Sequence, residues 1–336
     1  MEDLFLLIGT NPLPNFISVK HFLETEPNLK KIWFIYSKEN KFQSSTRFYA
    51  DNIKRLLEKD FTAKTVSFKF IELEDIENAR MIRNDLKNCI DTSSLNNVHL
   101  NITGGTKVMG IFSYLYFQDL RHCEKSFSYL SPKLFCLIDE NGKFLTNDLR
   151  DTIKLTVADV LNLHGYNYKS KDKGKLIGTP PSIEEVLENN NLDNRGRWFE
   201  RLIMEELEKN FNAELYKNLE IWRGDDFKNY FEIDALFFRG YQLFCFSLTT
   251  LNDNKKIISD KKTCKMKGFE VLLRTNQIGG DEAKAVLITL ADAKHVNLVR
   301  DELFYETGGK KKILVLGYDD FKYNNYIDSI KYFLDL

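Results

Sequence analysis

Apolar and polar residues over the first 150 positions follow two alternating patterns. Short, nearly continuous apolar runs, typical of parallel strands covered on both faces, are separated by stretches with an apolar residue every three or four positions, which predict helices. Strands separated by helices imply right-handed crossovers, so we expect an α/β domain with a mostly parallel, Rossmann-like sheet. The expected strands are residues 4–10, 31–37, 65–73 and 97–103, followed by a strand and a hairpin that turns at Asn141-Gly142.

The pattern changes after a short helix over 155–166, which His164-Gly165 closes. The next residues, 167–182, are basic and contain two glycines and a Pro-Pro pair, a composition typical of a linker. A long helix, a hairpin-like group of strands, another helix and another strand follow. We therefore expect two domains, residues 1–166 and 183–336, and the second should be α+β.

The charged, cysteine and histidine residues limit the kinds of site and chemistry that the chain can have. The chain has 48 basic and 49 acidic residues, so its near-zero net charge neither favours nor excludes nucleic acid, and any basic surface must be a local patch. The five cysteines form no C-x-x-C pair, which argues against a disulfide framework and a structural zinc site. The five histidines are scattered, which argues against a histidine metal centre. Catalysis must then depend mostly on carboxylates, lysines and hydroxyls.

The apolar runs also bear on location. None approaches the roughly 18 to 20 residues that span a bilayer, and the N-terminal sequence carries acids where a secretory signal needs Lys or Arg. We expect a cytoplasmic protein with no membrane contact.

Polar turns follow two of the expected strands of the first domain. The first turn is Gly9-Thr10-Asn11-Pro12, and the second covers 101–107 with the sequence Asn-Ile-Thr-Gly-Gly-Thr-Lys. Ligands of open parallel sheets bind at the carboxyl ends of strands, where helix N-termini offer unpaired N–H groups. Ser37, which ends the strand over 31–37, could join the same rim. The sequence therefore places a candidate ligand site at this edge of the sheet.

The second turn has the more specific chemistry. Gly104 and Gly105 allow a ligand to approach the backbone closely, Thr103 and Thr106 supply hydroxyls, and Lys107 supplies a cation beside the helix dipole. The alternative is a tight, capped strand-to-helix turn that binds no ligand.

The turn NITGGTKVMG, the opening LLIGTNPLPN and the closing LTVADVLNLHGY together resemble a CARF domain over residues 1–166. Domains of this family sense cyclic oligoadenylates made by type III CRISPR complexes, and two protomers pair so that their ligand turns hold one ring on the two-fold axis. The resemblance implies a homodimer that binds a cyclic oligoadenylate, with cyclic tetra-adenylate favoured. It also implies that the following residues line the pocket: Thr10, Asn11, Thr103, Gly104, Gly105, Thr106 and Lys107.

Three acidic residues of the second domain indicate a metal site. Glu232 and Asp234 are two apart in Phe-Glu-Ile-Asp-Ala, so on a strand they share one face. A carboxylate near the middle of such a strand is costly unless it is paired or bound to metal. Glu200 lies on the preceding long helix, and oxygen ligands of this kind suit Mg²⁺ or Mn²⁺. The alternative is that each acid is a solvated surface charge.

The order of helix Glu, strand Asp and second apolar strand resembles the PD-(D/E)xK nuclease fold over residues 195–292. The family carries Glu-x-Lys on the last of these strands, whereas this chain has Ser247-Leu248-Thr249 and lacks both residues. The lysine migrates in this fold, so the resemblance implies Glu200 and Asp234 as metal ligands, and Lys265 of the next helix as a third catalytic residue beside them. The alternative is that the lysines of that helix form a solvated face: Lys261, Lys262, Lys265 and Lys267.

These expectations combine into one leading function. It is a cyclic-oligoadenylate-activated, Mg²⁺- or Mn²⁺-dependent nuclease that cleaves DNA, RNA or both in type III CRISPR antiviral defence. The alternative is a sensing module whose degenerate second domain binds nucleic acid or a partner without cutting, which the missing Glu-x-Lys favours. A third hypothesis, a ring nuclease that degrades its own activator, has little support because no acid or histidine adjoins the Gly-Gly-Thr-Lys turn.

Overall fold

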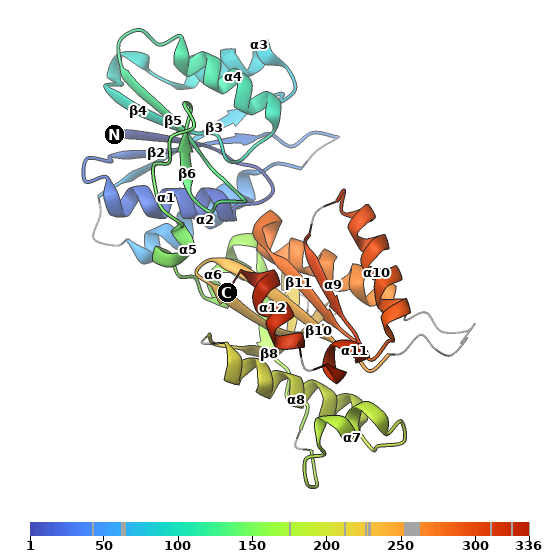
Figure 1. Cartoon of the computed structure of the whole chain (residues 1–336). Helices are drawn as coiled ribbons and strands as arrows, with labels where there is room; N and C mark the ends of the chain where they lie inside the picture. Colours follow the sequence, from blue (N-terminus) through green and yellow to red (C-terminus); the bar gives the residue numbers. More distant parts are fainter. Residues whose placement is uncertain are drawn as a thin grey trace. The chain divides into compact units, whose positions relative to one another are not determined.

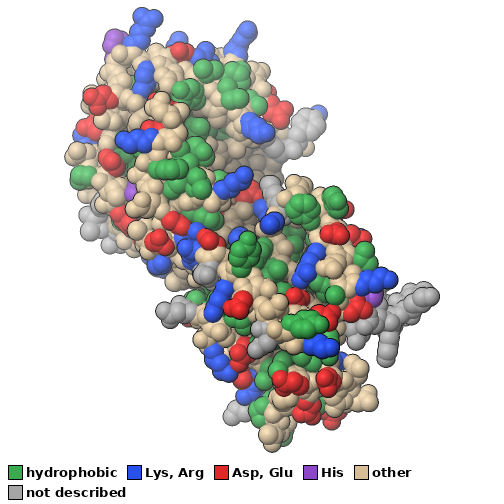
Figure 2. All heavy atoms as spheres, in the orientation of Figure 1, with side chains coloured by type: hydrophobic (Ala, Val, Ile, Leu, Met, Phe, Trp, Pro, Cys, Tyr) green, Lys and Arg blue, Asp and Glu red, His purple; other side chains and the backbone are tan. Residues whose placement is uncertain are grey.

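The computed structural model of the chain describes residues 1–41, 44–61, 65–174, 176–211, 213–225, 227, 230–251, 263–309, 311–323 and 325–335. The chain forms two compact units, Met1–Gly165 and Tyr166–Leu336, and each contains a six-stranded sheet (Figure 1). Acidic and basic side chains are interspersed over the visible face of both units (Figure 2). Over the described ranges, no helix combines the length and the apolar character needed to cross a bilayer.

The first unit is built on a sheet with the strand order β3-β2-β1-β4-β5-β6. All neighbouring strands are parallel except β5 and β6, which are antiparallel, and this confirms the predicted Rossmann-like architecture. The strands are β1 (Asp3–Leu7), β2 (Lys31–Ser37), β3 (Ser67–Leu73), β4 (Asn97–Asn101), β5 (Glu124–Leu130) and β6 (Leu137–Asp139). The helices are α1 (Leu13–Thr25), α2 (Arg47–Asp60), α3 (Ala79–Cys89), α4 (Lys107–Gln118), α5 (Leu149–Thr152) and α6 (Val157–His164).

The central position of β1 in this sheet explains why all of its residues after Asp3 are apolar. All of β1 is buried, because α1 and α2 cover one face of the sheet and α3 and α4 cover the other (Figure 1). Phe5 and Leu7 pack in one core cluster with Ile82 of α3 and Phe117 of α4. A sheet covered on both faces presents its polar chemistry at the strand ends.

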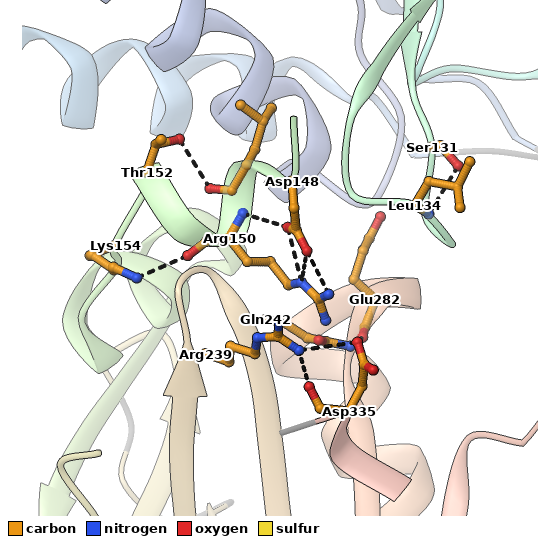
Figure 3. Close-up of polar contacts among 11 residues, drawn as sticks. Ser131, Leu134, Asp148, Arg150, Thr152, Lys154, Arg239, Gln242, Glu282 and Asp335 are labelled. Atoms are coloured by element: carbon orange, nitrogen blue, oxygen red, sulfur yellow. Dashed lines mark hydrogen bonds and ion pairs between the residues drawn. The ribbon is translucent and has the colours of Figure 1, made fainter. Parts of the chain in front are cut away.

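Polar contacts fix the elements that close the first unit (Figure 3). Asp148 caps α5 by accepting the backbone N–H of Arg150 at 2.9 Å, and it pairs with the guanidinium of the same residue at 2.6 Å. That guanidinium lies 3.7 Å from the centroid of the Phe135 ring. Helix α6 ends at Gly165, whose φ of 76° is left-handed, so the predicted closure at His164-Gly165 is confirmed.

The second unit has the strand order β12-β11-β10-β9-β8-β7. Strands β7 to β10 are antiparallel to their neighbours, and β10, β11 and β12 are parallel. The strands are β7 (Tyr166–Ser170), β8 (Tyr216–Arg223), β9 (Tyr230–Arg239), β10 (Gln242–Leu248), β11 (Lys284–Ile288) and β12 (Ile313–Leu316). The helices are α7 (Ile183–Glu188), α8 (Arg195–Asn210), α9 (Cys264–Gly279), α10 (Ala293–Glu306), α11 (Tyr318–Lys322) and α12 (Tyr326–Leu334).

The core of the second unit lies between its sheet and helix α8. Phe199 and Ile203 of α8 pack in one cluster with Phe237 of β9 and Phe246 of β10. Helix α9 packs against β10 and β11. In the same unit, the Gln242 side chain donates to the Glu282 carbonyl at 2.8 Å and ties β10 to the turn before β11 (Figure 3).

The segment expected to be a linker, 167–182, differs in the structure. Its first residues belong to β7, which pairs antiparallel with β8 as the edge strand of the second sheet. Its lysines are not a solvated run, because Lys171 and Lys173 pair with Glu232 and Glu200, which are 61 and 27 positions away in the chain. Ion pairs between residues this far apart leave no pattern in the local sequence. The composition of 167–182 therefore resembles that of a linker.

Candidate functional site

The Gly-Gly-Thr-Lys turn of the first unit connects β4 to α4 and leaves no space for a side chain at Gly104. A Cβ there would lie 2.1 Å from the carbonyl oxygen of Leu7 and 2.4 Å from Nδ2 of Asn15. Gly105 has a φ of 72°, the left-handed region that favours glycine. A Cβ on Gly9 would lie 2.9 Å from the backbone nitrogen of Gly105. The two predicted ligand turns therefore meet backbone against backbone.

Two hydroxyls of this turn hold the turn itself. Thr106 caps α4, because its Oγ1 accepts the N–H of Met109 at 3.2 Å. Thr103 Oγ1 accepts the N–H of Leu130 at 2.7 Å, which fixes the turn to β5. Lys107, by contrast, is exposed and forms no ion pair with any residue that the structure describes. The cation of the turn thus remains available for a ligand.

A cavity of about 700 Å³ opens over this turn. Five predicted residues line it, and apolar side chains of α4 and β5 form much of the remaining wall. Its full lining is Ile102, Thr103, Gly104, Gly105, Thr106, Lys107, Gly110, Ile111, Tyr114, Leu115, Phe127, Ser128, Tyr129, Ile138, Asp139 and Glu140. Backbone N–H groups at a helix N-terminus, a lysine and aromatic rings suit a ligand that carries phosphates and bases.

Three other predicted residues do not line this cavity. Thr10 is exposed in the turn after β1, and Asn11 accepts the N–H of Leu13 at 3.3 Å at the start of α1. Both follow Gly9 and so border the contact with the second turn. Ser37 is only 2% exposed, and its backbone N–H and hydroxyl both bond to Thr46 Oγ1, at 3.0 and 3.3 Å. Its hydroxyl thus holds the β2–α2 connection.

Asp234 of the second unit lines a hollow of about 400 Å³ beside α9. Its Oδ2 accepts the N–H of Leu248 at 2.7 Å and the hydroxyl of Ser247 at 3.3 Å. Burial raises the pKa of the Asp234 carboxyl, and the negative charge of Glu200 raises it further. The hydrogen bond from the Leu248 N–H lowers this pKa, but by less. The full lining is Tyr230, Phe231, Glu232, Ile233, Asp234, Phe246, Ser247, Lys267, Glu270, Val271 and Arg274.

Glu200 lies in a second hollow, of about 500 Å³, next to α8. Its Oε2 accepts an ion-paired hydrogen bond from Nζ of Lys173 at 2.7 Å. The negative charge of Glu200 contributes to the raised pKa of Asp234, but the two predicted metal ligands line different hollows. Over the described part of the chain, however, no three His, Cys, Asp or Glu residues gather in a group that would hold a metal ion.

Lys265 does not line either hollow. It pairs with Glu302 of α10 at 2.8 Å, whereas Lys267 lines the Asp234 hollow and pairs with Glu270 at 3.0 Å. Residues two positions apart on an α-helix are separated by about 200° around its axis. Lys265 and Lys267 therefore project from nearly opposite sides of α9. Lys261 and Lys262 lie outside the described residues.

Sequence reasoning missed two cations near the carboxylates, Lys173 and Lys267. Lys267 shares a helix face with Glu270 and Arg274, which are three and seven positions later, and this spacing could have separated it from Lys265. Lys173 is the third of four lysines at alternate positions, with Lys169, Lys171 and Lys175, and that period of two is the pattern of a strand face.

Proteins of known structure share this architecture. The family model described as Card1 CARF domain matches residues 4–166. Among curated proteins, no sequence matches the chain significantly. The structure of Can2 from Sulfobacillus thermosulfidooxidans in complex with cyclic tetra-adenylate superposes with a TM-score of 0.61 at 15% identity, over 98% of this chain and 99% of that one.

Two further solved structures resemble the chain. Protein VC1899 from Vibrio cholerae gives a TM-score of 0.66 at 14% identity, over 98% of each chain. A type III CRISPR defence DNA nuclease activated by cyclic oligoadenylate gives a TM-score of 0.52 at 15% identity, over 87% of this chain and 46% of that one. At these identities the likeness shows the fold of both units. The family match and the shared fold together identify residues 4–166 as a CARF domain.

Proposed function

We propose that the first unit binds a cyclic oligoadenylate, cyclic tetra-adenylate being favoured, and that the chain acts in type III CRISPR defence. The observation that carries this proposal is the 700 Å³ cavity over the Gly-Gly-Thr-Lys turn, at whose edge Lys107 remains exposed. Can2, which has the same fold, was solved with cyclic tetra-adenylate. Lys107 would neutralise a phosphate of the ring, and the N–H groups at the start of α4 would donate to its oxygens.

We further propose that two copies of the chain share one ring. Ile111 and Leu115 of α4 are 56% and 40% exposed at the wall of the cavity, and a second copy would cover this apolar surface. A symmetric ring of phosphates suits a two-fold axis because each half meets identical donors.

The proposed activity of the second unit is metal-dependent cleavage of DNA, RNA or both. The donor set fits a hard cation, because Mg²⁺ is commonly bound by one or two carboxylates and completed by water and substrate phosphate oxygens. Glu200 and Asp234 would hold Mg²⁺ or Mn²⁺, which would polarise the scissile phosphate and lower the pKa of an attacking water. Since two carboxylates are a small donor set, metal affinity should be weak until substrate binds.

The chain's own residues would orient and stabilise the substrate. Asp234 is held in place by the Leu248 N–H and the Ser247 hydroxyl. Lys267 and Arg274 line the same hollow from α9 and would pair with the phosphates of a bound strand. Fixed cations of this kind stabilise the negative charge that develops during phosphoryl transfer.

A cleavage assay tests this proposal. Purified protein is incubated with plasmid DNA and with single-stranded RNA, with and without Mn²⁺ and cyclic tetra-adenylate, and cutting is expected only when both are present. Asp234→Asn should abolish cutting and leave cyclic tetra-adenylate affinity unchanged, whereas the exposed matched control Asp328→Asn should cut normally. Equal cutting by Asp234→Asn and the parent would contradict the nuclease assignment.

One observation favours the non-cutting alternative. Thr249 stands where the PD-(D/E)xK family carries its lysine, and its N–H donates to the Ile288 carbonyl at 2.9 Å as an ordinary sheet bond. If the second unit only binds nucleic acid, the parent protein should shift an oligonucleotide in a ligand-dependent manner and leave it intact.

A further inference from the structure

The segment that follows the CARF domain carries a row of lysines directed at acids of the second unit. Lys169 pairs with Glu220 at 3.2 Å, Lys171 pairs with Glu220 and Glu232, and Lys173 pairs with Glu200. The alternate spacing places the three side chains on one side of β7 and its extension. This segment is the basic run that composition alone assigned to a linker.

Lys173 differs from the other two lysines of the row. Its Nζ lies 2.7 Å from Oε2 of Glu200, and its side chain is only 24% exposed. The backbone at this point is fixed to α8, because the guanidinium of Arg197 donates to the carbonyl oxygens of Lys173 and Gly174. The position of this ammonium group is therefore defined by contacts on both its side chain and its backbone.

Two lysines of α9 have other ion-pair partners, although Lys267 also lines the Asp234 hollow. Lys265 pairs with Glu302 of α10, and Lys267 pairs with Glu270 of its own helix. Only Lys173, among the lysines with ion pairs described in this unit, contacts Glu200 directly. The charge of Lys173 also lowers the pKa of Asp234, although Lys173 lines the hollow of Glu200 and not that of Asp234.

We propose that Lys173 supplies the lysine that the nuclease centre lacks at Thr249, and that it contacts the scissile phosphate. This inference rests on the proposed function. In hydrolysis, the oxygen of a water molecule bonds to phosphorus and the bond to one ester oxygen breaks; the water releases a proton to solvent and the leaving oxygen takes one up. Lys173 takes no part in these proton transfers and stabilises the negative charge on the phosphate oxygens.

Lys173 lies shortly after the point in the sequence at which the first unit ends. The first unit ends at Gly165 and β7 begins at the next residue, so the segment that leaves the CARF domain itself carries the cation. In the Glu-x-Lys arrangement the lysine belongs to a central strand. Here it lies three residues after the edge strand β7, which ends at Ser170.

The test compares Lys173→Met with Lys169→Met, a matched control that lies four positions earlier, on β7, and forms its ion pair with Glu220. With Mn²⁺ and cyclic tetra-adenylate, the single-turnover rate should fall at least 100-fold for Lys173→Met and stay within threefold of the parent for Lys169→Met. Lys173→Arg keeps the charge and should lose about tenfold. The double variant Lys173→Met/Thr249→Lys returns a lysine to the central strand and should recover at least tenfold over Lys173→Met.

Calorimetry with Mn²⁺ alone gives a readout that does not depend on cutting. Lys173→Met should bind Mn²⁺ at least as tightly as the parent, so that the loss of rate is not a loss of metal. If Lys173→Met instead cuts as fast as the parent, or faster, Lys173 only blocks Glu200 and the inference is overturned. A parent protein that does not cut at all refutes the proposed nuclease function itself, which is a separate result.

Discussion

Replacing Gly104 by Ala should destabilise the CARF domain, because a single methyl group has no space there. The new Cβ would lie 2.1 Å from the Leu7 carbonyl oxygen and 2.4 Å from Nδ2 of Asn15. These two atoms form a buried hydrogen bond of 2.9 Å with each other. The methyl group must therefore break that bond or move the turn.

The cost has two parts. Leaving a buried donor and acceptor unpaired costs about 1–3 kcal/mol, and overpacking a close-packed core costs about 1–3 kcal/mol more. We expect Gly104→Ala to lose about 2–6 kcal/mol of unfolding free energy. Cyclic tetra-adenylate affinity should fall with it, because the displaced turn carries Thr106 and Lys107 to new positions.

The control is the same substitution six positions later. Gly110 lies within α4, and a Cβ there would meet nothing within 4 Å. Since Gly costs roughly 0.5–1 kcal/mol in a helix relative to Ala, Gly110→Ala should stabilise the domain by about that amount. The two alanines thus have opposite expected signs.

Native-state hydrogen exchange of the β1 amides measures the unfolding free energy of the first unit separately from the second. Isothermal titration gives the ligand affinity. An unfolding free energy for Gly104→Ala within about 0.5 kcal/mol of the parent, the usual range for neutral surface changes, would refute the packing argument.

The other predictions concern the ligand, the assembly and pH. Lys107→Ala should cost about 1.5–3 kcal/mol of cyclic tetra-adenylate affinity in calorimetry, as the loss of a charge-assisted hydrogen bond does; unchanged affinity would mean that the pocket is elsewhere. Sedimentation should show at least a dimer, and a monomer that binds one ring with full affinity would disprove the shared site. Burial lowers the pKa of His99 from 6.5 to about 3, so the folded state resists protonation. Stability should be complete above pH 6.5 and fall towards pH 3, by about 2 kcal/mol at pH 5. His99→Gln should remove this loss from urea denaturation curves, and an unchanged pH dependence would count against it.

The sequence predicts the CARF half of the chain well, for a physical reason. Apolar runs of doubly covered strands are contiguous in sequence, and the turn over 101–107 holds its glycines, hydroxyls and lysine together. Ser37 could not be interpreted in the same way. Its position at a strand end resembles a ligand site, but whether its hydroxyl meets solvent depends on Thr46, which lies beyond the strand.

The second unit shows where sequence patterns become insufficient. The order of helix Glu and strand Asp is evident in the sequence, and in the structure Glu200 and Asp234 line two different hollows. The sequence does not show which lysine lies beside these carboxylates. Lys265 and Lys267 differ only in the side of α9 from which they project, and Lys173, which follows β7, pairs with Glu200 of α8, 27 positions later in the chain.

The backbone contact between the Gly9 turn and the Gly104-Gly105 turn limits how the CARF domain can change over time. Where main-chain atoms form the floor of a pocket, the side chains around it are free to drift without altering the donors that a ligand meets. Overall identity should then decay faster than ligand recognition. In a set of diverged relatives, these three glycine positions should be the last to vary.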